Sequence, residues 1–256
     1  MLKSLYRKVF SERKRIQIIH FIKKITSIFY YGNVFYCNCC NRSFRKFEVH
    51  GNIPRENARC PNCLSLERTR VLWMYLQHET VLLTNKIRVL HFAPEYAIKM
   101  QLKKYSNIDY VDADINPNLA TYQIDITDIP FDNESFDLII CSHVLGHVPD
   151  ESKAVNELFR VLKPDGVAFI QTVINANSNT TFEDSKLITP EERLKNYGEN
   201  DLVRLHGLDF IKRLEKSGFK VETIDYKKIL LKTHIEIEKY SLGNGERELI
   251  FKCWKL

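Results

Sequence analysis

The sequence predicts an α/β protein built on a doubly wound, mainly parallel sheet. Short apolar runs follow one another after residue 86, with amphipathic stretches between them: IRVLHFA, IDYVDADI, FDLIICSHVL and GVAFIQTVI. Buried parallel strands read as nearly continuous apolar runs, and the helices between them form the crossovers. This alternation is typical of the doubly wound class, in which ligands bind at the carboxyl ends of the strands.

Two features modify this pattern near the C-terminus. The segments FKVETIDY and RELIFKCWKL are separated by about 20 residues of loop character, which predicts an antiparallel pair that closes the sheet. Residues 175–206 are polar and come directly after a predicted strand. An insertion at the carboxyl end of a sheet is well placed to cover a site.

Length and composition fit one domain with a smaller appendage. The chain has 256 residues, 44% hydrophobic and 27% charged, which excludes a disordered protein. We expect a basic amphipathic helical arm over residues 1–34, a cysteine-containing unit with a connecting helix over 35–84, and the sheet domain over 85–256.

The N-terminal arm carries the basic excess of the protein. Residues 1–35 contain eight Lys or Arg and one acid, Glu12, whereas the whole chain has a net charge of +6. Such a segment suits RNA phosphates or peripheral contact with an anionic membrane, and the alternative is a solvated helix face. Ile18, Ile22, Ile25 and Phe29 recur at helical spacing and require an apolar partner surface.

The sequence predicts a cytoplasmic location. No run of 18 apolar residues is present, and His20, Lys23 and Lys24 interrupt the N-terminal apolar stretch, which argues against a transmembrane segment or a signal peptide. In a reducing compartment, seven cysteines suggest metal binding before disulfides.

Four of these cysteines have zinc-ligand spacing. Cys37 and Cys40 form one Cys-x2-Cys pair, Cys60 and Cys63 form another, and 19 residues separate the pairs. Four thiolates complete the tetrahedral shell of Zn²⁺, so the ion would be structural. Free cysteines are the alternative, and Cys39 could replace one member of the first pair.

The turn after the first predicted strand, in RVLHFAPEYAIKM, contains no glycine. Dinucleotide-binding turns use glycine where the backbone approaches the ligand and where the helix packs, and here those places hold Ala93, Glu95 and Ala97. A carboxylate at Glu95 would repel a pyrophosphate and attract a cationic group.

Two further acids follow predicted strand ends. Asp114 lies 19 positions after Glu95, where an acid accepts hydrogen bonds from ribose hydroxyls, and Asp125 can receive an adenine amino group. A ligand with ribose, adenine and an ammonium group but no phosphate is S-adenosylmethionine. An NAD-dependent oxidoreductase is the disfavoured alternative.

These residues also carry a family resemblance. The segment DITDIPFDNESFDLIICSHVLGHVPDESKAVNELFRVLKPDGVAFI (125–170) resembles the class I S-adenosylmethionine-dependent methyltransferases, in particular the type 11 group. CPNCLSLERTR together with LHFAPE is similar to members with an N-terminal four-cysteine zinc unit. The resemblance implies a seven-stranded Rossmann-like sheet in the order 3-2-1-4-5-7-6, with strand 7 antiparallel.

The resemblance also implies a set of cofactor-binding positions. The methionine end would face Phe92, Ala93, Pro94 and Glu95, the ribose would face Asp114 and Ile115, the adenine would face Asp125 and Ile126, and the pocket floor would be Cys141, Ser142 and His143. Two positions depart from the pattern of the family. Gly146 stands where such proteins often have Glu, and Leu202 stands where they often have His.

Two residues are candidates for catalysis. His143 follows the fourth predicted strand and has an imidazole that titrates near neutral pH, which suits a general base. Arg204, in the polar insertion, could hold an acidic group of the substrate. A structural role is the alternative for each, as it is for His147, His206, Arg68 and Arg70.

The sequence therefore indicates methyl transfer to an acceptor that it does not identify. We expect a small molecule or a nucleotide-linked sugar slightly ahead of RNA, because the polar insertion resembles a closing lid. The alternatives are a ribosomal RNA methyltransferase and a non-catalytic, cofactor-binding interaction protein, which the departures at Gly146 and Leu202 would permit.

Overall fold

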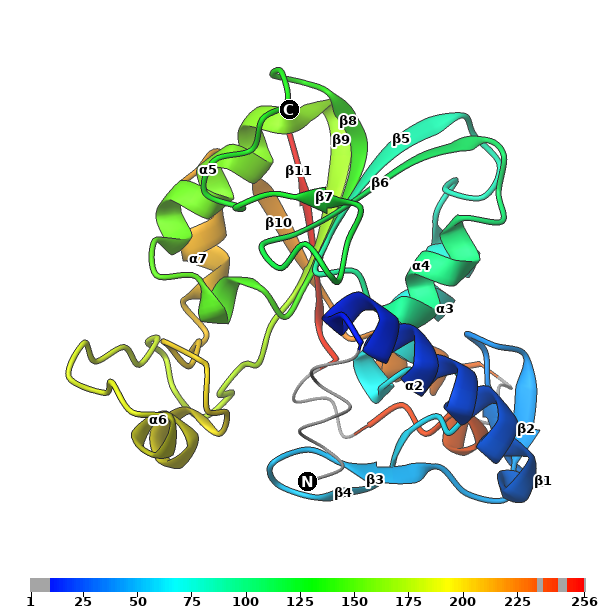
Figure 1. Cartoon of the computed structure of the whole chain (residues 1–256). Coiled ribbons are helices and arrows are strands. Elements are labelled where there is room, and N and C mark those ends of the chain that lie inside the picture. Colours follow the sequence, from blue (N-terminus) through cyan, green and yellow to red (C-terminus); the bar gives the residue numbers. More distant parts are fainter. Residues whose placement is uncertain (1–9, 234–236, 244–247, 256) are drawn as a thin grey trace.

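A computed structural model describes residues 10–233, 237–243 and 248–255. Its main feature is a seven-stranded sheet in the order β10-β11-β9-β8-β5-β6-β7 (Figure 1). The strand β11 runs antiparallel to the other six strands, which run parallel to one another. The predicted doubly wound order, with its antiparallel seventh strand, is confirmed. The strands are β5 (Ile87–Phe92), β6 (Ile108–Asp114), β7 (Tyr122–Gln123), β8 (Phe136–Ser142), β9 (Leu162–Gln171), β10 (Lys220–Ile224) and β11 (Ile250–Trp254).

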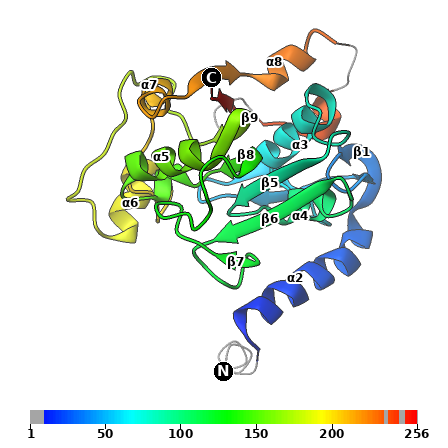
Figure 2. The ribbon, with the colours of Figure 1, turned by 90° about the horizontal axis from the view of Figure 1, so that it is seen from above.

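Helices cover both faces of this sheet (Figure 2). On one face lie α3 (Glu67–Glu79), α4 (Tyr96–Leu102) and α8 (Tyr226–Leu230), and on the other lie α5 (Glu151–Val161) and α7 (Phe210–Glu215). The polar insertion after β9 contains α6 (Pro190–Tyr197), which Thr189 and Glu192 cap reciprocally.

Two hairpins form the four-cysteine unit, defined here as residues 31–65. The strands β1 (Tyr31–Cys37) and β2 (Arg42–Phe44) pair antiparallel, as do β3 (Glu48–His50) and β4 (Arg55–Arg59). These strands are only three to seven residues long, which is too short to show a period of two in the sequence.

The connection between β10 and β11 is also more ordered than the sequence predicted. It contains α8 and the short helix η3 (Ile237–Tyr240), and it returns to the four-cysteine unit. There the Ser241 hydroxyl donates a hydrogen bond to the Asn57 carbonyl at 2.8 Å. The C-terminal part of the chain thus braces the N-terminal unit.

The basic arm becomes the helix α2 (Glu12–Thr26), followed by the short helix η1 (Ser27–Tyr30). Ser11 caps α2 by accepting from the Lys14 backbone N–H. Residues 1–9 of the expected arm, with Lys3, Arg7 and Lys8, lie outside the described residues. Among the helices that the structure describes, none is both long and apolar enough to cross a bilayer.

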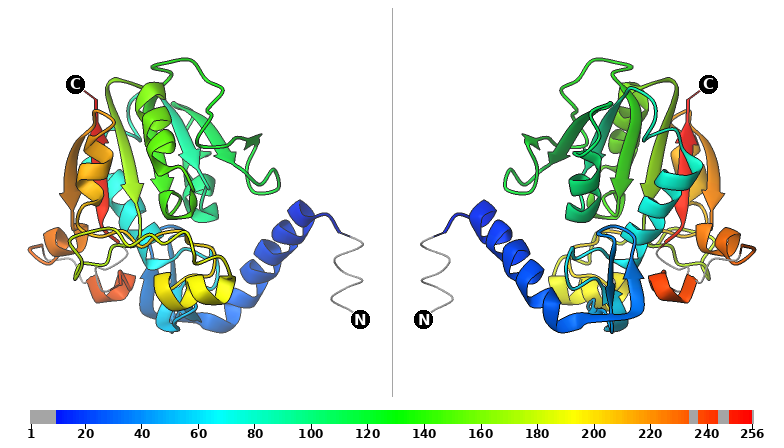
Figure 3. Two further views of the ribbon diagram at one scale, coloured as in Figure 1. Left: turned by 90° about the vertical axis from the view of Figure 1, so that its left-hand side faces the viewer. Right: turned by 90° about the vertical axis from the view of Figure 1, so that its right-hand side faces the viewer.

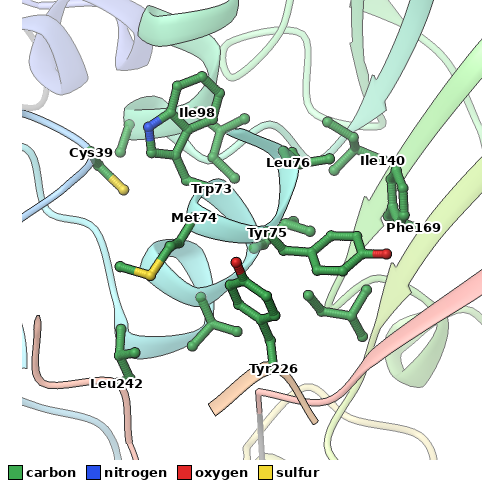
Figure 4. Packing of buried hydrophobic residues seen from close by; sticks show 14 of the residues in the cluster. Cys39, Trp73, Met74, Tyr75, Leu76, Ile98, Ile140, Phe169, Tyr226 and Leu242 are labelled. Atoms are coloured by element: carbon green, nitrogen blue, oxygen red, sulfur yellow. The ribbon is translucent and has the colours of Figure 1, made fainter. Parts of the chain in front are cut away.

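The four-cysteine unit and the sheet share one hydrophobic core. A single cluster runs from Cys37 and Phe47 through Trp73 of α3 to Ile140 and Phe169 of the sheet. Figure 4 shows Trp73, Met74, Tyr75 and Leu76 of α3 at its centre. Nine of the thirteen residues of α3 are buried, because the helix is enclosed by both parts of the protein.

A buried arginine in α3 connects three parts of the chain. The Arg70 side chain is fully buried. Its guanidinium donates to the carbonyls of Ala58 and Ser65 in the four-cysteine unit and to those of Tyr240 and Ser241 before β11, at 2.5–3.1 Å. A planar group with five donors suits four converging carbonyls.

We expect Arg70→Met to lower the free energy of unfolding by about 2–4 kcal/mol, because it leaves buried carbonyls without donors. Urea unfolding followed by circular dichroism measures the change. Arg42→Met, at an exposed position in β2, is the control and should shift stability by less than about 0.5 kcal/mol. Equal effects of the two substitutions would contradict the role assigned to Arg70.

Candidate functional site

A cavity of about 690 Å³ opens at the carboxyl ends of the central strands. We call it the strand-end cavity. It is lined by Phe92 and Ala93 after β5, Asp114 and Ile115 after β6, Ile124, Asp125, Ile126 and Thr127 after β7, His143, Val144, His147, Val148, Pro149 and Asp150 after β8, and Asp201 from the insertion. Parallel strands end at one edge of a sheet, so residues far apart in sequence meet there.

Two residues of the cavity wall adopt backbone conformations that glycine normally takes. Ala93 has φ of 45° and His143 has φ of 55°. Each is held in place, since the Ala93 N–H donates to Ala113 O at 2.9 Å and the His143 N–H donates to Gln171 O at 2.8 Å. Such conformations cost about 1 kcal/mol or more and persist where the surroundings impose them. The turn thus keeps a glycine-like shape without glycine.

The two predicted acids line the same cavity. An Asp114 carboxylate oxygen accepts from the Asn116 N–H, and an Asp125 oxygen accepts from the Thr127 N–H, each at 2.8 Å. Burial raises the pKa of the Asp114 carboxyl. Both acids are therefore oriented by backbone donors two residues ahead of them.

Glu95, in contrast, does not line the strand-end cavity. Its carboxylate lies 3.3 Å from His91 Nε2 and 3.9 Å from Arg68 Nε. Burial alone would raise the pKa of this carboxyl, but the hydrogen bond with His91 and the charge of Arg68 hold it below its usual value. The cationic neighbour of Glu95 is thus a residue of α3.

Three other residues of the expected cofactor set also lie away from the cavity. Pro94 borders a separate hollow beneath α2. Cys141 and Ser142 are buried in β8, where the Ser142 hydroxyl donates to Gln171 Oε1 at 3.0 Å. They lie at the last positions of the strand, and the side chain that reaches the cavity is His143.

Arg204 is buried and has a structural position. Its side chain does not line the strand-end cavity. Its guanidinium donates to the carbonyls of Leu145, Val148 and Pro149 at 2.5–2.8 Å and forms a salt bridge with Glu183 at 2.9 Å. It fastens the insertion to the segment after β8. All of these hydrogen-bond and salt-bridge partners are groups of the protein itself. The Arg204 guanidinium is therefore not directed at a substrate.

His206 is likewise buried in a network of protein groups. Its Nε2 lies 2.5 Å from Glu151 Oε1, and its Nδ1 lies 2.9 Å from the Thr172 hydroxyl. Burial would raise the pKa of the Glu151 carboxyl, but the hydrogen bond with His206 and the charge of Arg213 keep it below its usual value. This network attaches the insertion to α5.

A second hollow of about 420 Å³, here called the adjoining cavity, shares part of its wall with the first. The shared residues are His143, His147 and Asp201. The rest of the wall comes from the four-cysteine unit, the start of α3 and the insertion: His50, Gly51, Asn52, Arg55, Leu66, Arg68 and Glu199. Sequence analysis did not predict this cavity, because its walls come from four separate segments of the chain.

In the sequence, His147 is weighed only against a structural role, and Asp201 is not considered. His147 Nδ1 lies 3.6 Å from Asp201 Oδ1 where the two cavities meet. The only sequence signal was the spacing of HVLGH, which places His147 four residues after His143. Asp201 lies in the insertion, and its position depends on how that segment folds back.

The two positions that depart from the family pattern face each other. Leu202 is buried, and its Cδ2 lies 2.7 Å from where a Cβ at Gly146 would stand. A side chain at position 146 would therefore collide with Leu202. The two departures belong together, since the glycine makes the space that the leucine fills.

The four predicted zinc ligands converge in the four-cysteine unit. The sulfurs of Cys37 and Cys63 are 3.5 Å apart, and those of Cys40 and Cys60 are 3.8 Å apart. All four lie within 4.8 Å of one another. Sulfurs about 2.3 Å from a tetrahedral Zn²⁺ are separated by about 3.8 Å, whereas disulfide sulfurs are about 2.05 Å apart. The spacing suits a metal cluster.

The surroundings of these sulfurs support the same interpretation. Burial raises the pKa of the Cys60 thiol, so ionised sulfurs here require a cation. The Ser65 hydroxyl lies 3.2 Å from the Cys37 sulfur and 3.3 Å from the Cys63 sulfur. Ser65 thus lies beside the sulfurs, two residues before the start of α3 at Glu67. Cys39 lies outside the cluster, with its sulfur 3.8 Å from Thr69 O.

Comparison with known proteins matches part of this sequence to a protein family. Residues 89–170 match the family described as "Methyltransferase domain". A 42-residue stretch is 50% identical to the demethylmenaquinone methyltransferase of Clavibacter sepedonicus and covers 16% of this chain and 17% of that protein. A 59-residue stretch is 39% identical to the ubiquinone/menaquinone biosynthesis C-methyltransferase UbiE of Idiomarina loihiensis and covers 23% and 24%.

These matches span less than a quarter of the length of either curated relative. A putative S-adenosylmethionine-dependent methyltransferase from Listeria monocytogenes, of known structure, is 15% identical, with 73% of this chain and 97% of that chain covered and a TM-score of 0.48. The family match runs from β5 to β9 and includes the strand ends that form the strand-end cavity. Residues 89–170 of this chain thus resemble a methyltransferase domain, and the same chain carries a four-cysteine cluster.

Proposed function

We propose that this protein transfers a methyl group from S-adenosylmethionine to an acceptor held in the adjoining cavity. The observation that carries the proposal is the shared wall of the two cavities, made by His143, His147 and Asp201. S-adenosylmethionine supplies an activated methyl group on a sulfonium. The protein mainly has to position two molecules side by side.

The strand-end cavity offers suitable groups for each part of the cofactor. Asp114 can accept hydrogen bonds from ribose hydroxyls, and Asp125 can accept one from an adenine amino group. Ile115 and Ile126 give the apolar contact that an adenine ring requires, and Phe92 and Ala93 border the methionine end. Glu95 would act at a distance, by holding the turn through His91 and Arg68.

The size of the adjoining cavity favours a compact acceptor. About 420 Å³ suits a small molecule or a nucleotide-linked sugar better than a folded RNA. His143 borders both cavities and is the best placed residue to accept a proton from an acceptor hydroxyl or amine. A quinone precursor of the kind named for the curated relatives belongs in any acceptor screen.

The four cysteines would hold one structural Zn²⁺. All four positions of a tetrahedral ion would be filled by sulfur, so the ion would stabilise the unit and not take part in the reaction. Cysteines that do not form disulfides persist in a reducing compartment. We therefore place the protein in the cytoplasm.

Asp114→Asn should weaken S-adenosylmethionine binding by about 10- to 100-fold, because it replaces a charged acceptor of ribose hydrogen bonds with a neutral one. Isothermal titration calorimetry measures the Kd. Asp109→Asn, at an exposed position on the same strand, should leave the Kd unchanged. Equal affinity of the Asp114 variant and wild type would place the ribose elsewhere.

His143→Asn should lower kcat by about 100-fold or more, with little effect on cofactor affinity, if the imidazole is the general base. Asparagine tolerates the positive φ of this position. A screen with radiolabelled cofactor against small molecules, nucleotide-linked sugars, quinone precursors and RNA identifies the acceptor. Cofactor binding without turnover on any acceptor class would favour the non-catalytic alternative.

One zinc ion per chain should be found by mass spectrometric elemental analysis of the purified protein. Cys60→Ser combined with Cys63→Ser should remove it and lower the Tm, because metal binding supplies folding free energy to so small a unit. Cys39→Ala is the matched control and should retain the ion, since Cys39 lies outside the cluster. Zinc retained by the double variant would refute the ligand set.

A further inference from the structure

The helix α2 turns polar side chains towards the protein. The His20 ring stacks on Tyr96 with 3.7 Å between ring centroids, and Lys23 Nζ lies 2.5 Å from Glu48. The Glu12 carboxylate accepts hydrogen bonds from two asparagine amides after β6, at 3.1 and 3.3 Å. Surface helices usually bury an apolar face against the core, whereas the printed contacts of α2 with the protein come from polar side chains.

The outward side of this helix is apolar. Phe21, Ile22 and Ile25 of α2, with Ile28 and Phe29 of the following η1, form what we call the outer stripe, and each residue is between 49% and 74% exposed. No residue of α2 is buried. Figure 3 shows α2 as an arm at the periphery of the molecule.

Basic residues border the outer stripe. At 100° per residue, Arg13 and Lys24 lie along one edge, Arg15 lies along the other, and Lys14 lies at the N-terminal end of the stripe. Between Glu12 and Tyr31 the sequence has five Lys or Arg and one acid.

We propose that the outer stripe inserts into the surface of an anionic membrane. An apolar stripe of isoleucine and phenylalanine between rows of lysine and arginine is the pattern of helices that lie in a lipid interface. The apolar side chains enter the acyl region, and the cations meet anionic headgroups.

Charge and composition separate this occupant from the alternatives. A second copy of the chain would bring two basic helices together, so that like charges would face each other across the contact. RNA would pair with the cations but would leave the isoleucines in water, because nucleic acid grooves and phosphates offer them little apolar surface. An anionic bilayer satisfies both parts of the helix.

Docking would also place the proposed site near the lipid surface. The inner side of α2 contacts Tyr96 of α4 and the asparagines after β6. These segments directly follow the turn and the strand that supply Ala93 and Asp114 to the strand-end cavity. The docking test measures binding alone and does not depend on methyl transfer.

The test is sedimentation of the full chain with vesicles of phosphatidylglycerol and phosphatidylcholine, or of phosphatidylcholine alone. Wild type should bind the anionic vesicles, bind the neutral ones at least tenfold more weakly, and lose affinity as salt rises. Ile22→Ser with Phe29→Ser should lower partitioning by at least about tenfold, because two apolar side chains no longer enter the bilayer.

The control removes two exposed isoleucines outside the stripe. Ile53→Ser with Ile188→Ser, at positions 67% and 72% exposed, should bind vesicles as wild type does. All variants should keep the wild-type Tm, and vesicles should slow amide hydrogen exchange between residues 12 and 31 in wild type and in the control variant but not in the stripe variant. Three outcomes would overturn the proposal: no binding to anionic vesicles, equal binding by the stripe variant, or a wild-type dimer in sedimentation velocity that the stripe variant abolishes.

Discussion

The buried guanidinium of Arg70 is the interaction on which the arrangement of this protein depends. It satisfies carbonyls of the four-cysteine unit and of the segment before β11, and it sits above the Phe47 ring at 4.8 Å. A buried cation is stable only where its donors are used, so these segments have to converge on α3. That convergence makes one hydrophobic core out of two parts of the sequence.

The same helix links the cysteine cluster to the proposed reaction site. α3 begins four residues after Cys63, and its second residue, Arg68, reaches Glu95 at the turn after β5. Arg68 also borders the adjoining cavity, together with His50 and Arg55 of the four-cysteine unit. The four-cysteine unit thus forms one wall of the adjoining cavity, so a structural metal bound by the four cysteines would influence the proposed site without a chemical role.

Several polar residues that the sequence offers as functional candidates are buried and have structural contacts. Arg204 and His206 are fully engaged by protein groups and attach the insertion to the segment after β8 and to α5. Gly146 and Leu202 are a packed pair. The family pattern implies polar side chains at these two positions, and this chain has an apolar contact there. The polar groups at the junction of the two cavities are His143, His147 and Asp201.

The sequence by itself determined the sheet, because buried strands and amphipathic helices leave distinct periods, and it determined the cysteine cluster, because four ligands have a recognisable spacing. It also placed Asp114, Asp125 and His143 at strand ends, which parallel topology brings to one edge. Only the tertiary structure decided that Glu95 faces Arg68, that Asp201 joins His147, and that α2 turns its apolar side outwards. These depend on contacts between distant segments and on the direction of each side chain, and local patterns of residue type encode neither.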